Sequence, residues 1–200
     1  MTSVLCSLRC ARSTSTHSSC VALTATIYNF DIQLADVDRG VYETLAIRVA
    51  CQPSETAEYL LSRVLAYCLE YAEGIGFSKG IAEPDVPALA VRDLTGAMRV
   101  WIDVGAPDAA RLHKASKAAP RVALYTQKEP RVLMRGYEGA RIHRAEHVDI
   151  FAMDRELLAS LADHLDKRVK FSLSVTDGQL YVDINGTVLP GTVERLTLPT

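Results

Sequence analysis

The order of helix-like and strand-like patterns along the chain is the feature that most limits its fold. Between residues 54 and 154 the two patterns interleave, with helices predicted over 54–73 and 107–119 and a strand hairpin between them. Both ends of the chain carry patterns of antiparallel hairpins. Such an order places helices against a shared sheet. The sequence therefore predicts an α/β (α+β) domain with a mixed central β-sheet flanked by helices, and extra antiparallel strands at both ends.

Individual elements follow from local periodicity. The helix over 54–73 has a stripe of apolar residues at helical spacing and ends at Gly74. Residues 22–34 and 41–51 read as two strands joined across a turn rich in Asp and Gly. Further strands are predicted over 88–92, 99–105, 121–126 and 147–154, a helix over 155–166, and a C-terminal meander across an Asp-Gly and an Asn-Gly turn.

The first twenty residues differ in composition from the rest. They are rich in Ser and Thr, contain no acid and precede a strand pattern that starts after Val21. We interpret residues 1–20 as an unstructured N-terminal extension, produced by a gene-start artefact, with a transit peptide as the alternative. Residues 21–200 contain no repeat or linker and are predicted to form a single domain.

Composition excludes several classes of protein. No apolar run approaches the roughly 18–20 residues that span a membrane, so no membrane partner is expected. The five cysteines form no C-x-x-C pair, which argues against a structural zinc site and a disulfide framework. We therefore expect a cytoplasmic protein in a reducing compartment.

Two aspartates lie on neighbouring predicted strands, where Asp is a poor strand former. In "EPDVPALAVRDLTGAMRVWIDVG" (83–105), Asp85 precedes the first strand and Asp103 lies near the end of the second. Glu55 falls in the first turn of the long helix. Convergent carboxylates form a hard oxygen site of the kind that binds Mg²⁺ or Mn²⁺. The alternative is ordinary: a turn residue, a strand-end residue and a helix cap.

Several stretches of the chain resemble the YaeQ family, whose fold is a variant of the PD-(D/E)xK, restriction-endonuclease-like nuclease fold. The matching text is "ATIYNF" (25–30), "PSET" (53–56), "VWIDVG" (100–105), "PD" (107–108) and "ALYT" (123–126). The resemblance extends from about residue 22 to the C-terminus. It implies a restriction-endonuclease-like core and nuclease activity that depends on a divalent metal ion.

Carried over to this chain, the resemblance implies that Asp85 and Asp103 bind the metal and that Glu55 holds a metal-bound water. The lysine of the motif would stand two residues after Asp103, where this chain has Gly105. Lys114, on the following helix, is predicted to replace it. The alternative is that the charges of this helix are merely solvated.

Basic residues concentrate in one part of a chain whose overall net charge is −2. Residues 111–144 contain nine Lys or Arg against Glu129 and Glu138. Arg111 and Lys117 belong to this run and are predicted to bind substrate. Such a run suits a phosphate backbone, and we expect DNA or RNA as partner. Two hypotheses follow: a metal-dependent nuclease, or an inactive nuclease-like scaffold that binds nucleic acid or a protein.

Overall fold

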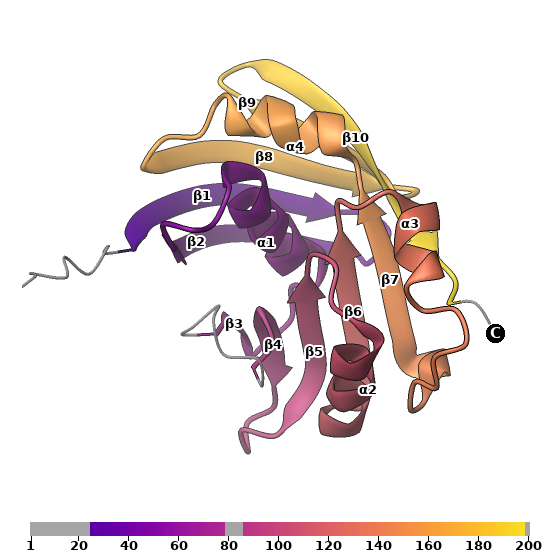
Figure 1. Ribbon diagram of the computed structural model, residues 1–200. Helices are drawn as coiled ribbons and strands as arrows, with labels where there is room; N and C mark the ends of the chain where they lie inside the picture. The colour runs from indigo at the N-terminus through magenta and orange to yellow at the C-terminus, as the bar shows by residue number, and fades with distance from the viewer. Residues whose placement is uncertain (1–24, 79–85, 199–200) are drawn as a thin grey trace, which may run out of the picture.

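The computed structural model describes residues 25–78 and 86–198, which form a mixed α+β domain (Figure 1). Within these residues, ten strands make one strongly curved sheet in the order β2-β1-β8-β9-β10-β7-β6-β5-β4-β3, and four α-helices pack on it. The predicted mixture of sheet and helices is confirmed. Among the described residues, no helix is both long and apolar enough to cross a membrane.

One half of the sheet consists of the predicted antiparallel ribbons. β1 (Thr26–Asp36) pairs with β2 (Val41–Cys51), and β8 (Arg168–Thr176), β9 (Gln179–Ile184) and β10 (Thr187–Leu196) form the meander. Its two turns contain Asp177 and Asn185 at positive φ, as hairpin turns of this type require. β1 also pairs in parallel with β8, which joins the two ends of the chain in one sheet.

The other half contains the interleaved elements. β3 (Ile75–Phe77), β4 (Leu89–Arg92) and β5 (Met98–Val104) are antiparallel, whereas β6 (Arg121–Thr126) and β7 (Val148–Met153) continue in parallel from β5. Helix α2 (Ala109–Ala118) forms the crossover from β5 to β6. The carboxyl ends of β5 and β6 therefore lie side by side, which is where parallel sheets place their ligand sites.

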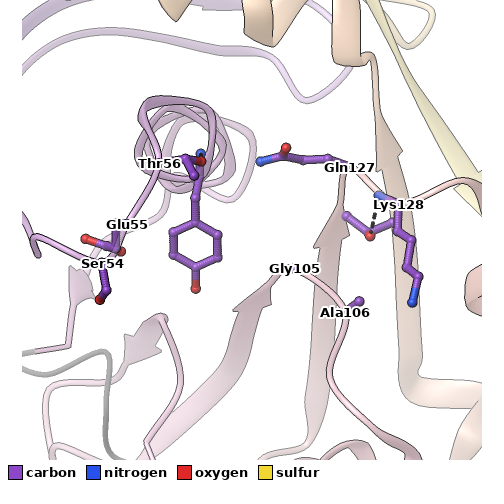
Figure 2. Close-up of a pocket in the computed structure, with 9 residues that line it drawn as sticks. Ser54, Glu55, Thr56, Gly105, Ala106, Gln127 and Lys128 are labelled. Carbon is purple, nitrogen blue, oxygen red and sulfur yellow. Dashed lines mark hydrogen bonds between the residues drawn. The ribbon is translucent and has the colours of Figure 1, made fainter.

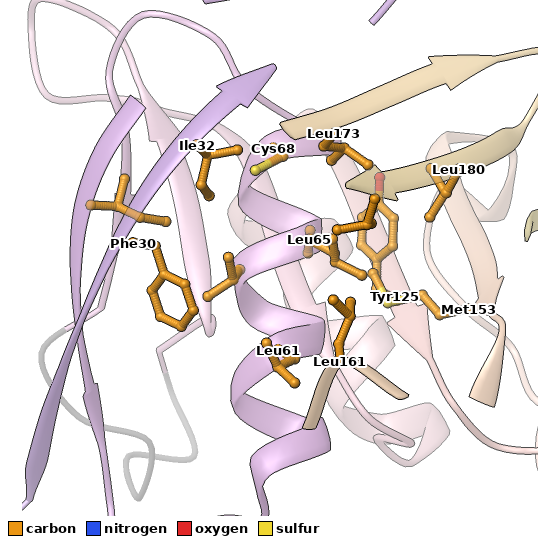
Figure 3. Close-up of a cluster of buried hydrophobic side chains, with 14 of the residues drawn as sticks. Phe30, Ile32, Leu61, Leu65, Cys68, Tyr125, Met153, Leu161, Leu173 and Leu180 are labelled. Atoms are coloured by element: carbon orange, nitrogen blue, oxygen red, sulfur yellow. The ribbon is translucent and has the colours of Figure 1, made fainter. Parts of the chain in front are cut away.

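The main core lies around α1 (Ala57–Leu69), packed against strands from both halves of the sheet (Figure 3). Leu65 of α1 shares this core with Phe30 on β1 and Leu173 on β8, and α4 (Arg155–Ala162) contributes Leu161. Because α1 is buried along most of its length, the residues at its N-terminus are held in a fixed position relative to β5.

A second core covers the opposite face of β5 and β6. Trp101 and Leu124 pack there against Leu112 of α2 and Leu133 of α3 (Pro130–Arg135). The last four residues of β5 are buried, so both faces of the carboxyl-terminal half of this strand are covered. Helix α3 and strand β3 were not predicted, because they are too short to show a periodic pattern.

Candidate functional site

A pocket of about 420 Å³ opens between the N-terminus of α1, the connection from β5 to α2, and the segment after β6. Figure 2 shows Glu55 and Lys128 on opposite sides of this pocket, with Gly105 between them. We call it the strand-end pocket; its lining residues are Ser54, Glu55, Thr56, Tyr59, Gly105, Ala106, Thr126, Gln127 and Lys128.

Glu55 is fixed by the tight connection from β2 to α1. Its Oε2 accepts a hydrogen bond from the Gln52 backbone N–H at 2.7 Å, and its side chain is only 4% exposed. Its Oε1 lies 3.5 Å from Nε of Arg63, and neither atom has a hydrogen-bond partner in the described structure. The buried carboxylate is therefore balanced by one cation and keeps an oxygen without a donor.

Arg63 is itself held by both end strands of the sheet. Its Nη2 donates to the Ala50 carbonyl of β2 at 2.6 Å, and its guanidinium lies 5.8 Å from the ring centre of Phe77 on β3. These contacts compensate in part for the burial of its charge. They fix the cation that faces Glu55.

Ile102 and Val104 of β5 face the main core, whereas Asp103 points to the opposite face of the strand, toward α2. This placement follows from the alternation of side chains along a strand. Arg111 of α2 binds both of its oxygens: Nε donates to Oδ2 and Nη2 to Oδ1, each at 2.8 Å. The same guanidinium lies 5.8 Å from the ring centre of Trp101. Asp108 positions the helix by accepting from the Arg111 backbone N–H at 2.8 Å. α2 thus supplies a cation to Asp103, and that cation is Arg111.

Gly105 has a backbone conformation that explains why no lysine stands there. Its φ is +109°, a value that side-chain-bearing residues rarely adopt. A Cβ at this position would contact the Tyr59 ring at 3.5 Å. The backbone therefore favours glycine at the position where the nuclease motif has lysine.

Tyr59 links the two acids. Its hydroxyl donates to the Val104 carbonyl at 3.3 Å. Burial raises the pKa of the Tyr59 phenol, with further increases from Glu55 and Asp103 that the neighbouring arginines oppose. Both carboxylates therefore act on one ring at the end of β5, although Glu55 lines the strand-end pocket and Asp103 does not.

Three residues of the predicted site remain: Lys114, Lys117 and Asp85. Lys114 and Lys117 follow Arg111 at three-residue spacing on α2, and both are exposed. Asp85 lies outside the described residues. Across the part of the chain that the structure describes, no three His, Cys, Asp or Glu residues are grouped as potential metal ligands. Arg111 therefore binds Asp103 near the end of β5, Glu55 lies in the neighbouring strand-end pocket, and the place of Asp85 stays a prediction.

Sequence reasoning did not single out Tyr59 or Gln127 as site residues, and it included Lys128 only as a member of the basic run over 111–144. Gln127 donates through Nε2 to the Ser62 hydroxyl at 2.8 Å, which holds its side chain against α1. Gln127 and Lys128 directly follow strand β6. That position, at the carboxyl end of a strand parallel to β5, was the available signal.

The basic run over 111–144 divides into structural and exposed residues. Arg111 binds Asp103, and Arg121 binds both Glu70 and Asp149. The other seven are exposed: Lys114, Lys117, Lys128, Arg131, Arg135, Arg141 and Arg144. They lie on α2, on α3 and on the segments around α3, and Lys128 brings this exposed basic surface to the strand-end pocket.

The pentad "HRAEH" (143–147) fits a metallopeptidase pattern that needs an α-helix. Arg144 instead has φ 47°, and Ala145–His147 form a single 3₁₀ turn before β7. The two histidines are therefore not presented on one face of an α-helix, and we exclude this interpretation.

Comparison with known proteins identifies the family. Residues 21–192 match the family model described as "YaeQ protein". The chain is 29% identical over 164 residues to YaeQ of Escherichia coli (strain K12), a match that covers 81% of this chain and 90% of that protein. YaeQ of Salmonella typhi is 28% identical over the same length. The chain belongs to the YaeQ family, as its sequence resemblance indicated.

Solved structures of two relatives have the same fold. The crystal structure of YaeQ from Pseudomonas syringae is 32% identical and superposes with a TM-score of 0.81, covering 88% of this chain and 97% of that one. YaeQ from Xanthomonas axonopodis pv. citri is 27% identical, with a TM-score of 0.80 and coverage of 88% and 100%.

Proposed function

We propose that this protein is a divalent-metal-dependent phosphodiesterase that acts on nucleic acid, built on a restriction-endonuclease-like core. The observation that carries the proposal is the set of groups near the end of β5: Asp103 with a cation from α2 on one face, and Glu55 beside an open pocket on the other. A strand-end acid, a helix acid and a nearby cation are the groups that this chemistry requires.

The donor set fits a hard divalent cation in its chemistry. Among the described residues, Oδ2 of Asp103 accepts one hydrogen bond, from Arg111, and has a second lone pair, whereas Oδ1 accepts from Arg111 and also from the Ala88 backbone N–H at 3.4 Å. Glu55 keeps one buried oxygen without a hydrogen-bond donor, which suits a hydrogen bond from a metal-bound water. Mg²⁺ and Mn²⁺ prefer such carboxylate oxygens. The proposal assigns the further ligand to Asp85.

A bound divalent ion would lower the pKa of an attacking water and neutralise charge on the phosphate. The protein's own groups complete this role. Glu55 accepts a hydrogen bond from the water and orients it. Arg111 and Lys114 offset the negative charge that develops on the phosphate, in place of the lysine that Gly105 excludes. Lys117 and the exposed basic residues around α3 bind the flanking backbone.

Cleavage of labelled single- and double-stranded DNA and RNA tests the proposal. Wild type is compared with Asp85→Asn, Asp103→Asn and Lys114→Met in Mg²⁺ or Mn²⁺, with EDTA as the blank. Glu43→Gln is the matched control, because Glu43 is an exposed acid on β2. We expect cleavage by wild type and the control, and a loss of at least 100-fold in the three variants. Cleavage that survives in Asp103→Asn contradicts the assignment.

A second candidate function is binding of nucleic acid without cleavage. The bidentate Arg111–Asp103 pair favours it, because a carboxylate held by arginine needs no metal ion to balance its charge. Binding by wild type on a gel, without cleavage in any metal, would support this second candidate.

A further inference from the structure

We infer that the strand-end pocket holds one unpaired nucleotide, so that the substrate class is single-stranded nucleic acid or a strand with an unstacked base. The inference deepens the proposed function, on which its choice of ligand rests. It concerns binding alone and is tested without metal.

The size of the pocket is the first observation that supports this inference. Its volume of about 420 Å³ falls in the range of small-ligand pockets, roughly 300–1,000 Å³. Its walls come from α1, the β5–α2 connection and the segment after β6, so it is a recess at the strand ends and not an extended groove. A base that enters such a recess must leave its duplex partner.

The lining supplies the contacts that an unpaired nucleotide uses. Tyr59 gives an aromatic surface, and its ring is held by the hydrogen bond that its hydroxyl donates to the Val104 carbonyl. Aromatic rings bind unpaired bases by stacking. Gln127 is held by Ser62 through one amide hydrogen, which leaves its amide oxygen to accept from a base edge.

Charge points to a ligand that carries phosphate. Lys128 is exposed at the side of the pocket opposite Glu55. Helix α3, which begins two residues later at Pro130, carries the exposed Arg131 and Arg135. The surface that leads away from the pocket is therefore basic, with Glu129 as a local acid that caps α3. An uncharged peptide or metabolite would not need this surface, whereas a nucleotide within a strand would.

Fluorescence anisotropy in EDTA tests the inference. The probe is a labelled 12-nucleotide single strand, compared with the same sequence as a blunt duplex. We expect the single strand to bind at least 10-fold more tightly. Tyr59→Phe keeps the ring and should bind like wild type, whereas Tyr59→Leu should bind single strand about 5- to 100-fold more weakly, the effect of losing one stacked base.

Two further variants separate the pocket from general charge and from misfolding. Lys128→Met and the matched Lys170→Met each remove one exposed lysine, but Lys170 lies on β8, away from the pocket residues. Lys128→Met should weaken single-strand binding at least threefold, and Lys170→Met should not. Gln127→Ala, which leaves the buried core intact, should weaken it as well, and thermal unfolding of each variant verifies the fold.

The outcomes also distinguish this inference from the proposed function. Preferential single-strand binding that depends on Tyr59 and Gln127 supports the pocket assignment, even if no metal produces cleavage. Equal affinity for the duplex, or binding unchanged in Tyr59→Leu and Gln127→Ala, overturns it, even if the protein cleaves DNA.

Discussion

The Arg111–Asp103 pair allows a quantitative test of how the site is held. Replacing Arg111 by Met leaves a buried carboxylate without its cation. Breaking a fully buried pair costs about 3–5 kcal/mol, whereas an exposed pair contributes about 1 kcal/mol or less. The Asp103 side chain is 4% exposed and that of Arg111 27%. We therefore expect Arg111→Met to lower the free energy of unfolding by about 2–3 kcal/mol, between these limits and nearer the buried one.

Urea unfolding measures this change, followed by circular dichroism and by the fluorescence of Trp101, the chain's single tryptophan, beside the pair. With a slope of roughly 2 kcal/mol per molar urea, the midpoint should fall by about 1–1.5 M. Lys117→Met is the control, because it removes an exposed charge from the same helix and should cost under about 0.5 kcal/mol.

A double-mutant cycle with Asp103→Asn isolates the pair. Once the carboxylate is an amide, loss of Arg111 leaves no buried charge behind, so the double variant should be more stable than the two single costs predict, by at least about 1 kcal/mol. A cost of less than about 0.5 kcal/mol for Arg111→Met, together with an additive cycle, would refute the reasoning.

Three further predictions concern Gly105, Cys68 and Glu70. Gly105→Ala should lower stability in urea by about 1–2 kcal/mol because φ is +109°, whereas Gly76→Ala, at a strand glycine with open space, should not. Burial raises the pKa of the Cys68 thiol from 9.0 to about 12, so the folded state holds this proton more tightly. The difference in free energy of unfolding between wild type and Cys68→Ala, measured in urea, should therefore be constant below pH 9 and shift against wild type as the pH rises toward 12. A difference that stays constant over the whole pH range contradicts this prediction. Glu70→Gln should lower the free energy of unfolding by about 2–3 kcal/mol, measured by thermal unfolding, because the buried Glu70 carboxylate accepts hydrogen bonds from Arg121 and Tyr125. Glu43→Gln, at an exposed position, should change it little.

Much of the fold was readable from local patterns. The strands over 41–51 and 121–126 have the predicted bounds, and Asp154 caps the helix that was expected after it. Asp108 lies at the start of the predicted helix over 107–119 and caps α2. These elements are set by alternation, caps and turn residues close in sequence. The parallel pairing of β1 with β8 was not readable, because its partners are about 140 residues apart and no local signal selects them.

The features of the candidate site also divide into those that the sequence predicts and those that depend on the folded structure. The placement of Asp103 on the α2 face of β5 follows from the two-residue period of a strand. The choice of Arg111 as its partner depends on the rotation and height of α2, which the sequence does not define. Gly105 was visible as a departure from the motif, but its positive φ is a property of the folded connection. Lys128 reaches the pocket only because β6 lies beside β5.

Binding of Mn²⁺ is the measurement that tests the central claim most directly, because it requires no choice of substrate. Thermal unfolding of wild type, Asp103→Asn and Glu43→Gln is followed with increasing Mn²⁺ and again after EDTA. At 100 times its dissociation constant, an ion bound only by the folded state adds about 2.7 kcal/mol. The account predicts this stabilisation in wild type and Glu43→Gln and its loss in Asp103→Asn. Absence of stabilisation in wild type, or equal stabilisation in Asp103→Asn, would contradict a metal site at the end of β5.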